Sequence, residues 1–421
     1  MSQLRVLIVG ASIAGPMTAY WFAKAGAKVT MIERFPGLRT SGQNIDIRTA
    51  GVTVMRKIPG MEEAVRAKVY PMDGISFVNK EDKVFAKMTA TGNPDQQSLI
   101  SEYEIFRGDL GKILFDLTKD NENVKVVFGE QVASMEQNEK EHGPVKVEFQ
   151  NGYPTSEYDL VVACDGATSR TRAIGLGCGV RDHIKSVNCW AAWFSINRDL
   201  VNGSKWGQGF SAVGGRFVAM GLDPSGNTNV TLMGINPRDS QDRTLPFRQA
   251  LKEGEQALKQ YVAKHYDGAG WRTDEIMKEM MDSEDFYASE LVQVKTPALS
   301  KGRFAMVGDA GYCPGPTGGG TSLAMAGGYV LAGEILKHKG NLAAGLGGYE
   351  ETMRPLITEL QKIPPLVLTI AAPQTAWGIW IRNSILAFVS WTRIIEFVQR
   401  FFGGAFSKAD TYPLPEYDWL A

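Results

Sequence analysis

The sequence predicts an α/β protein with a Rossmann-like nucleotide-binding domain, an inserted antiparallel β-sheet domain and C-terminal helices. Three observations predict this fold class. A strand, a glycine-rich turn and a helix open the chain, and a second segment of the same kind begins near residue 303. Between them lie short apolar runs separated by turn residues. The nucleotide-binding domain is therefore expected to be discontinuous, with a second sheet inserted into it.

The first unit begins with the apolar strand 5–9 (RVLIV), and residues 16–25 form the expected helix. The turn between them supplies five candidate cofactor-binding residues: Gly10, Ser12, Ile13, Ala14 and Gly15. A turn without bulky side chains lets the N–H groups at a helix N-terminus face a pyrophosphate. Ser12 replaces the second glycine of the strict pattern, but its small side chain still permits close approach.

The second strand, residues 28–32, ends at Glu33, 23 positions after Gly10. A carboxylate at this point can accept hydrogen bonds from the hydroxyls of an adenosine ribose. We assign Glu33 and the adjoining Arg34 to the cofactor site. Because Glu33 disfavours a 2′-phosphate, NADP is not expected as the resident nucleotide. The alternative is a glycine-rich turn that only joins a strand to a helix, and the acid at the end of the second strand argues against it.

Residues 158–163 (YDLVVA) predict a further buried strand, which ends at a turn containing Asp165 and Gly166. Arg170 and Arg172 follow this turn. We interpret the segment as a lining for dinucleotide phosphates. An ordinary strand and loop with exposed arginines is the alternative.

The third segment consists of strand 303–307 (RFAMV), a Gly- and Pro-rich loop and a helix over 322–336. Asp309 can bind a ribityl hydroxyl chain, while N–H groups at the helix start can stabilise negative charge on a reduced flavin ring. The three segments, in this order, point to FAD, and a glycine-rich linker is the alternative for the third. The candidate cofactor-binding residues here are Gly308, Asp309, Pro316, Gly319, Gly320 and Thr321.

With these segments, residues 1 to about 360 resemble the class A FAD-dependent monooxygenases of the para-hydroxybenzoate hydroxylase type, including tetracycline-inactivating and natural-product aromatic hydroxylases. The resemblance implies bound FAD, transient NADPH or NADH, and O2. It implies hydroxylation or epoxidation of an aromatic or polycyclic small molecule through a flavin hydroperoxide. It places the ADP at the first turn, Asp165 and Gly166 along the FAD and NAD(P)H path, and Asp309 at the ribityl chain.

The resemblance also assigns two arginines. Residues 106–110 (FRGDL) match the position where the family has an arginine at a helix start, which implies that Arg107 contacts the FAD pyrophosphate. Its alternative is a solvent-facing helix arginine. Residues 42–48 (GQNIDIR) resemble a stretch that approaches the ring in the tetracycline-inactivating subgroup, which places Arg48 near the flavin. No residue is assigned a catalytic role beyond this placement of Arg48.

The sequence departs from the family pattern after the third strand. Tyr312 stands where many relatives have His. Pro314, Gly315 and the glycines after Thr317 are implied to flank the isoalloxazine, but the loop beyond Pro316 aligns only to within about one position.

The expected FAD-binding domain comprises residues 1–75, 100–180 and 290–350, and the substrate domain comprises 76–99 and 181–289. Within the latter, runs between 188 and 235 predict an antiparallel sheet. Its aromatic side chains either stack on a flat substrate or form the core face of the sheet. These are Trp190, Trp193, Phe194, Trp206, Phe210 and Phe217.

Residues 351–421 are expected to form a C-terminal helical region. No charged residue occurs from 363 to 381, a length that would suit a membrane span. Pro364, Pro365 and Pro373 interrupt this stretch, and charged residues follow at helical spacing at Arg393, Glu396 and Arg400. Amphipathic helices packed on the substrate domain are therefore favoured over contact with a membrane surface. The resemblance implies an extra helix over the substrate entrance.

The composition argues against a nucleic-acid-binding protein, a metalloprotein and a disulfide-rich protein. The chain has 421 residues and a net charge of −1, which gives no electrostatic case for a nucleic acid partner. Four cysteines without paired spacing and four scattered histidines indicate neither a metal nor a disulfide framework. A strand that begins almost at Met1 leaves no room for a signal peptide, so a cytoplasmic location is expected.

Two alternative functions stay open. One is a FAD-dependent reductase or dehydrogenase of an isoprenoid-like substrate, and the other is a non-redox FAD-binding protein. A flavin halogenase is disfavoured, because the segment from Trp190 to Trp193 is not the Trp-x-Trp-x-Ile-Pro motif.

Overall fold

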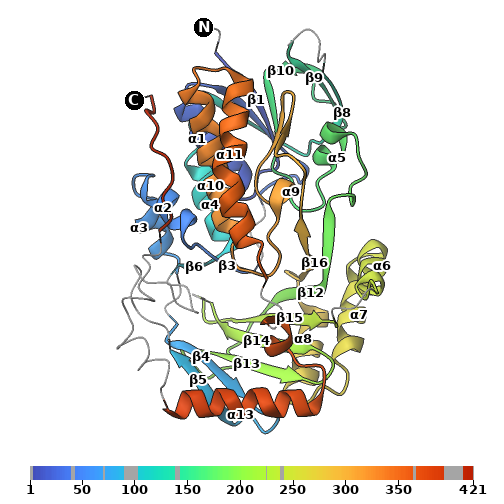
Figure 1. The fold of residues 1–421 in the computed structure, drawn as a ribbon. Helices are drawn as coiled ribbons and strands as arrows, with labels where there is room; N and C mark the ends of the chain where they lie inside the picture. The colour runs from blue at the N-terminus through green and yellow to red at the C-terminus, as the bar shows by residue number, and fades with distance from the viewer. Residues whose placement is uncertain are drawn as a thin grey trace.

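The computed structural model describes residues 3–38, 43–69, 72–89, 103–137, 143–223, 225–237, 241–363, 367–392 and 411–420. The chain forms two tiers, each built around a sheet (Figure 1). The upper tier holds a mainly parallel sheet with long helices, and the lower tier holds a mainly antiparallel sheet. The expected fold class is confirmed.

The upper sheet has the strand order β17-β18-β11-β1-β2-β7. All neighbouring strands pair in parallel except β17 and β18. Because parallel strands end at one edge, the segments that follow β1, β11 and β18 lie side by side. The bounds are β1 (Arg5–Val9), β2 (Lys28–Glu33), β7 (Val124–Phe128), β11 (Leu160–Ala163), β17 (Ser300–Lys301) and β18 (Phe304–Met306).

Two small sheets flank this one. The first contains β8 (Val132–Glu136), β9 (Val145–Phe149) and β10 (Ser156–Tyr158). The second pairs β3 (Asn44–Asp46) with β6 (Glu104–Phe106) in antiparallel fashion. This second pair matters for the site, because it joins the 43–48 segment to the start of the helix that begins at Arg107.

The helices of the upper tier are α1 (Ala14–Lys24), α2 (Ala50–Arg56), α3 (Met61–Arg66), α4 (Arg107–Asp116), α5 (Arg170–Leu176), α9 (Asp309–Tyr312), α10 (Gly320–Lys337) and α11 (Leu342–Leu360). The central one is α10, whose residues 322–335 are all buried. It packs against α1, α2 and α11. A Cβ at Gly328 would lie 2.9 Å from the Thr18 hydroxyl, so this glycine permits the close crossing with α1.

The lower sheet has the order β16-β12-β15-β14-β13-β4-β5. Its neighbours are antiparallel except for β13 and β4. Helices α6, α7 and α8 cover one face and form a core with it. The bounds are β4 (Gly74–Val78), β5 (Val84–Thr89), β12 (Ile184–Ile196), β13 (Trp206–Ala212), β14 (Arg216–Leu222), β15 (Thr228–Ile235), β16 (Tyr287–Val294), α6 (Leu245–Glu253), α7 (Glu255–Tyr266) and α8 (Thr273–Asp282).

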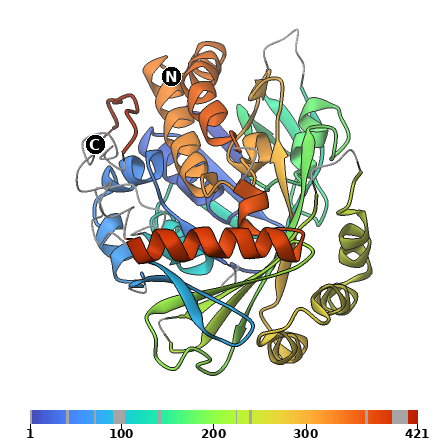
Figure 2. The same ribbon diagram turned by 60° about the horizontal axis from the view of Figure 1, so that its bottom comes forward.

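The C-terminal part of the chain contacts both tiers. Helices α12 (Val367–Ala371) and α13 (Ala376–Thr392) belong to the lower tier, where α13 packs on β5 and β13 (Figures 1 and 2). Pro364, Pro365, Arg393, Glu396 and Arg400 lie outside the described residues. None of the described helices combines the length and apolarity that a bilayer-spanning segment needs.

Residues 411–420 differ from the helical expectation for this region, because they run without helix along the upper tier. Pro413 and Pro415 disfavour a helix here. Aromatic packing holds the stretch instead: the rings of Trp419 and Trp21 lie 4.5 Å apart, and the Tyr417 hydroxyl donates to buried Glu334 at 2.9 Å.

Candidate functional site

The three glycine-containing segments meet at the carboxyl edge of the upper sheet. A Cβ at Gly10 would lie 2.7 Å from the carbonyl oxygen of Cys164, directly before Asp165. A Cβ at Gly308 would lie 3.1 Å from the Cβ of Ala14. Segments almost three hundred residues apart in sequence are therefore in contact, and glycine is what allows it.

The first turn needs glycine most strictly at Gly15. A Cβ there would lie 1.8 Å from the carbonyl oxygen of Gly10, and Gly10 itself has φ +108°. Helix α1 begins at Ala14 with Ile13 as its N-cap residue, and no side chain caps it. The helix start thus presents backbone N–H groups beside a surface without bulky side chains, which suits a phosphate.

Arg107 and Ser12 come together across this turn. The guanidinium of Arg107 donates to the Ser12 hydroxyl from Nε at 3.2 Å and from Nη2 at 3.1 Å. The backbone places it there, because β6 pairs with β3 and the N–H of Arg107 donates to Gln43 O at 3.0 Å. A positive charge is therefore held beside the glycine-containing turn.

Glu33 faces the same turn from the end of β2. Its Oε2 accepts a hydrogen bond from Ala11 N at 2.9 Å, and its Oε1 accepts one from Phe35 N at 3.0 Å. Arg34 places its guanidinium 4.7 Å from the Phe35 ring. The carboxylate is thus held at the edge of the turn.

Asp309 begins the short helix α9, directly after Gly308. Burial raises the pKa of its carboxyl, and the Arg107 charge and a Cys313 contact partly oppose this. Gly320, the first residue of α10, lies close by, since a Cβ there would be 3.7 Å from Asp309 Oδ1. Pro316, Gly319 and Thr321 lie in the same loop and first turn. This arrangement combines an acceptor for hydroxyl groups with a helix N-terminus.

The 43–48 segment is fastened to that same helix start. Arg48 N donates to the Ser322 hydroxyl at 3.1 Å, and this hydroxyl donates to Arg48 O at 2.6 Å. Arg48 Nε lies 3.2 Å from Asp46 Oδ2. A Cβ at Gly318 would be 3.5 Å from the same carboxylate oxygen. Arg48 is therefore beside the loop that precedes α10.

The segment around Asp165 and Gly166 is held mainly by its own contacts. Asp165 accepts hydrogen bonds from the hydroxyls of Ser169 and Thr171 and from Thr171 N. Arg172, interpreted from sequence as a phosphate-lining residue, is fully buried. Its Nη1 donates to Ala310 O and its Nη2 to Val180 O, both at 2.7 Å. Arg172 therefore braces α5 against α9, a role that its exposed-looking sequence context could not reveal.

A cavity of about 320 Å³ lies between the β3–β6 pair and the lower sheet. Within the described part of the chain, three of its amides each have a buried atom without a hydrogen-bond partner: Gln43 Oε1, Gln208 Oε1 and Asn229 Nδ2. Because an unsatisfied buried polar atom is costly, such atoms at a cavity wall are suited to bind a polar ligand. No local sequence pattern points to these amides, which come from strands and loops that are separate in the chain.

The aromatic residues of the lower sheet divide between its two faces. Trp193 and Phe217 line the cavity, as does Phe106 from the upper tier. The side chain of Phe194, the residue after Trp193 in β12, points to the opposite face and packs in the core. Trp190 is fully buried and stacks on Phe247 of α6, so it belongs to the core. Phe210 is likewise in the core, and Trp206 lies under the Lys87 ammonium. Both sequence interpretations thus apply, to different residues.

Glu104 is a further cavity residue that the sequence did not single out. It pairs with Asp46 across the β3–β6 ladder and accepts a hydrogen bond from Asn44 Nδ2 at 3.0 Å. Burial, and then the nearby Asp46 charge, raise the pKa of Glu104 to about 7, against the opposing effects of Asn44 and Arg48. The cavity therefore contains a carboxyl poised to exchange a proton near neutral pH.

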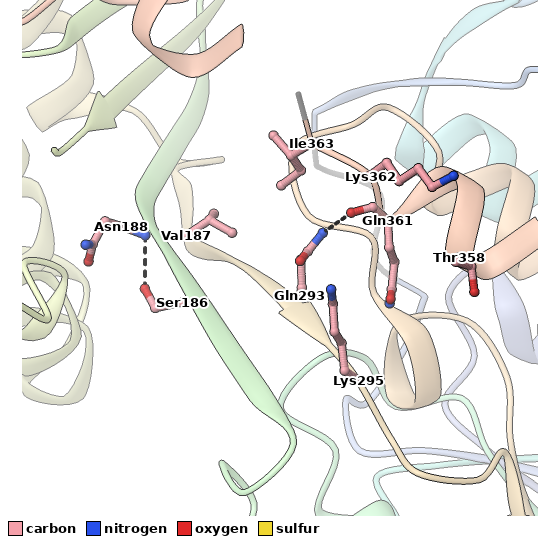
Figure 3. A pocket seen from close by; sticks show the side chains of 9 residues that line it. All are labelled: Ser186, Val187, Asn188, Gln293, Lys295, Thr358, Gln361, Lys362 and Ile363. Carbon is pink, nitrogen blue, oxygen red and sulfur yellow. Dashed lines mark hydrogen bonds between the residues drawn. The ribbon is translucent and has the colours of Figure 1, made fainter. Parts of the chain in front are cut away.

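A second cleft, of about 750 Å³, lies between β12 and the end of α11 (Figure 3). Gln293 forms its inner wall and donates to Pro314 O at 3.0 Å and to Gln361 O at 2.6 Å. Lys295 and Lys362 also line it, and neither has a carboxylate partner within the described part of the chain. The cleft thus reaches the back of the Pro314 loop and carries positive charge.

Comparison with known proteins agrees with this geometry. Residues 3–360 match a family described as FAD binding domain. The chain belongs to this family. It is 34% identical to the FAD-dependent monooxygenase asL4 of Sarocladium schorii, over 94% of each chain. It is 31% identical to the monooxygenase CTB7 of Cercospora beticola, over 99% of this chain and 98% of that protein.

Solved structures show the same fold. The tetracycline destructase Tet(51) superposes with a TM-score of 0.75 at 26% identity, over 99% of this chain and 100% of that one. Tet(55) gives 0.74 at 27% identity, over 99% of both chains. This member of the FAD-binding domain family is thus an FAD-dependent monooxygenase, and FAD is its cofactor. The glycine-lined turn, the Arg107 charge and half-buried Asp309 fit that cofactor.

Proposed function

We propose that this monooxygenase uses NADPH or NADH and O2 to hydroxylate or epoxidise an aromatic or polycyclic small molecule in the cavity between the two tiers. The observation that supports this most directly is the composition of the cavity. Aromatic side chains line it, and three amides offer unsatisfied polar atoms. A flat substrate that carries hydroxyl or carbonyl groups matches both features. The tetracycline destructases, named for a polycyclic compound, share the fold.

Each of the three glycine-containing segments binds a different part of FAD. In this proposal the first turn, from Gly10 to Gly15, holds the pyrophosphate together with Arg107, and Glu33 binds the adenosine ribose. Asp309 binds the ribityl chain, and the start of α10 faces the ring beside Arg48. FAD, when bound, supplies the two-electron chemistry that activates O2 for transfer of one oxygen atom to the substrate.

The remaining task of the protein is to hold the substrate and exclude water. Trp193 stacks on Tyr287 with ring centroids 5.7 Å apart, which fixes one wall of the cavity. Asn229 is oriented because its Oδ1 accepts from the Ser195 hydroxyl at 3.0 Å, leaving its Nδ2 for the substrate. The main-chain N–H of Ser195 in turn donates to Asp285 Oδ1 at 3.0 Å, which holds Ser195 in place. The amide is thus preorganised to donate to a substrate carbonyl or hydroxyl.

Glu104 gives the reaction a testable pH dependence. We expect ionised Glu104 to accept the proton of a phenolic hydroxyl, which makes the aromatic ring more electron-rich. Because the pKa of Glu104 is raised to about 7, kcat/KM should rise with pH up to that value and then level off. Glu104→Gln should lose this inflection, while Glu253→Gln, at an exposed position on α6, should keep it. An unchanged inflection in the Glu104 variant would exclude this role.

The same substitution should change stability with a defined sign. A carboxyl whose pKa is raised from 4.5 to about 7 on folding stabilises the protein below pH 4.5, and this contribution is lost as pH rises through 7. At pH 8.5, Glu104→Gln should therefore raise the free energy of unfolding, by about 2–3 kcal/mol. At pH 4.5 the two proteins should be equally stable. Urea unfolding at both pH values measures the difference.

The redox part of the proposal is tested with FAD-loaded protein mixed anaerobically with NADPH or NADH, alone and with phenolic, indolic and tetracyclic compounds. Loss of the flavin absorbance, accelerated by one class of compound, is the expected result. A flavin that stays oxidised under every condition would contradict the proposal and favour a non-redox role. Reduction followed by hydrogenation or desaturation of an isoprenoid-like compound would favour the reductase or dehydrogenase alternative.

A further inference from the structure

Helix α13 reverses the usual pattern of a surface helix. Surface helices normally turn apolar side chains toward the protein and charged ones toward water. The single charged residue of α13, Arg382, is only 8% exposed. Its guanidinium donates to Asn383 Oδ1 at 2.8 Å and to Ala371 O at 3.2 Å. The charge therefore points inward, and the apolar side chains point outward.

These apolar side chains form one continuous stripe, which we call the α13 stripe. Its exposed fractions are 67% for Trp377, 58% for Trp380, 39% for Ile381, 57% for Ile385, 57% for Phe388 and 83% for Trp391. The spacing of three and four residues keeps them on one side of the helix. Six of the twelve strongly exposed large hydrophobic residues in the described chain belong to it, so this is a concentrated patch and not scattered exposure.

The inner side of α13 is fixed to the lower sheet. The N–H of Lys87 in β5 donates to the Ser390 hydroxyl at 3.0 Å. The turn before the helix is also held, because Gln374 Nε2 donates to Ile235 O at 2.6 Å and Gly214 N donates to Gln374 O at 2.9 Å. The helix lies along the bottom of the lower tier in Figure 1, and it runs across the front of the molecule in Figure 2, where the bottom is turned forward. These contacts fix the inner side of α13 to the protein, so the stripe on the other side faces outward.

The chemistry of the stripe fits a lipid surface. Tryptophan gathers at the boundary between headgroups and acyl chains, because its ring is apolar while its N–H seeks a polar partner. The indole N–H groups of Trp377, Trp380 and Trp391 have no hydrogen-bond partner within the described residues. Residues 376–392 contain no acidic side chain that lipid phosphates would repel. The 17-residue helix is about 25 Å long, enough to lie along a bilayer plane.

We propose that the α13 stripe docks this enzyme on the surface of a lipid bilayer, with the helix lying in the interface. The sequence alone did not favour contact with a membrane surface. The structure favours it, because the only charged side chain of α13, Arg382, points toward the protein. Docking of this kind inserts side chains into one leaflet and spans nothing, which agrees with the described helices.

Docking would bring the substrate cavity toward the lipid. Helix α12 contacts the cavity face of the lower sheet, because the Ser211 hydroxyl donates to Ala371 O at 3.4 Å and Ser211 pairs with the cavity residue Phe217. Directly paired strand residues share a face. The substrate class that fits is an apolar polycyclic compound that partitions into membranes. This consequence rests on the proposed function, whereas the docking itself does not.

The test is flotation of the FAD-loaded full-length protein with vesicles of phosphatidylcholine, with and without about one third phosphatidylserine. The wild type should float with the vesicles, and the triple variant Trp377→Ser, Trp380→Ser and Trp391→Ser should show at least a tenfold lower partition coefficient. A matched control, Leu245→Ser with Leu251→Ser, removes exposed leucines of α6 and should float like the wild type. Bound-flavin absorbance and Tm confirm that each variant is folded.

Several outcomes would overturn the proposal. Wild-type protein that stays with the soluble fraction for both vesicle types would do so. Equal flotation of the wild type and the triple variant would place the contact elsewhere on the molecule. If the wild type sediments as a dimer and binds no vesicles, and the triple variant sediments as a monomer, the stripe would instead be the contact with a second copy of the chain. None of these readouts depends on turnover, so they are separate from a failure of the proposed function.

Discussion

Gly15→Ala is expected to abolish stable FAD binding and to be the most damaging single substitution in the cofactor site. The added methyl group would lie 1.8 Å from the carbonyl oxygen of Gly10. Gly10 cannot retreat, because it packs on the carbonyl oxygen of Cys164. The start of α1 must therefore move away from the turn. We expect FAD affinity to fall by about a hundredfold or more, and unfolding to become easier by about 3–5 kcal/mol.

Gly347→Ala is the matched control for this substitution. Both glycines lie within helices, but a Cβ at Gly347 would meet no atom within 4 Å. This control should bind FAD normally and should unfold slightly less easily, since alanine has the higher helix propensity. Flavin fluorescence titration gives the affinity, and urea unfolding gives the stability. Normal FAD affinity in Gly15→Ala would show that the cofactor does not lie on this turn.

Arg107→Ala is expected to weaken FAD binding by about ten- to a hundredfold, the effect of losing a charge-assisted pair of hydrogen bonds. The guanidinium already lies 3.1–3.2 Å from the Ser12 hydroxyl, over the start of α1, so it needs little rearrangement to reach a pyrophosphate. Arg107→Lys should recover only part of the affinity, because a lysine cannot donate two parallel hydrogen bonds.

Lys112→Ala provides the control on the same helix. Lys112 is exposed and pairs with Asp116 at 2.8 Å, away from the turn. Its removal should leave FAD affinity unchanged. If the Lys112 and Arg107 variants lose FAD affinity equally, Arg107 acts through long-range electrostatic attraction and not through a direct contact. Repeating the titrations at high salt separates the two, because screening weakens only the general effect strongly.

The local signals in the sequence were enough to predict the two sheets and the positions of the three glycine-containing segments. Each of these signals is contained in a short window, such as the strand 5–9 followed by the turn to Gly15. Their meeting at one edge also follows from the sequence, because parallel strands share their carboxyl edge.

The residues that were missed are those that long-range pairing brings together. Glu104 acquires its raised pKa only because β6 pairs with β3 and places it opposite Asp46. Gln43, Gln208 and Asn229 meet at one cavity from separate strands and loops. Arg172 looks like an exposed loop arginine in sequence, yet its partners, Ala310 O and Val180 O, bury it. Most of these contacts join residues that are far apart in the sequence, so no short stretch of sequence predicts them.

The orientation of helix α13 could not be predicted from the sequence either. Composition correctly indicates a helix rich in apolar residues, but it does not say which side faces the protein. The orientation of α13 follows from the contacts of Arg382 and Ser390 with Ala371 and β5. It is this orientation that leaves three tryptophans exposed.

In the proposed function, one oxygen atom of O2 is transferred to an aromatic compound in the cavity between the tiers. The most direct test supplies 18O2 and NADPH to the FAD-loaded enzyme, with the compound that best accelerates flavin reduction, and measures the product mass. A gain of one 18O atom per product, lost when Asn229→Leu and Gln208→Leu remove the cavity amides, is the predicted result. A product without 18O, formed while NADPH is consumed, would exclude oxygen transfer in this cavity.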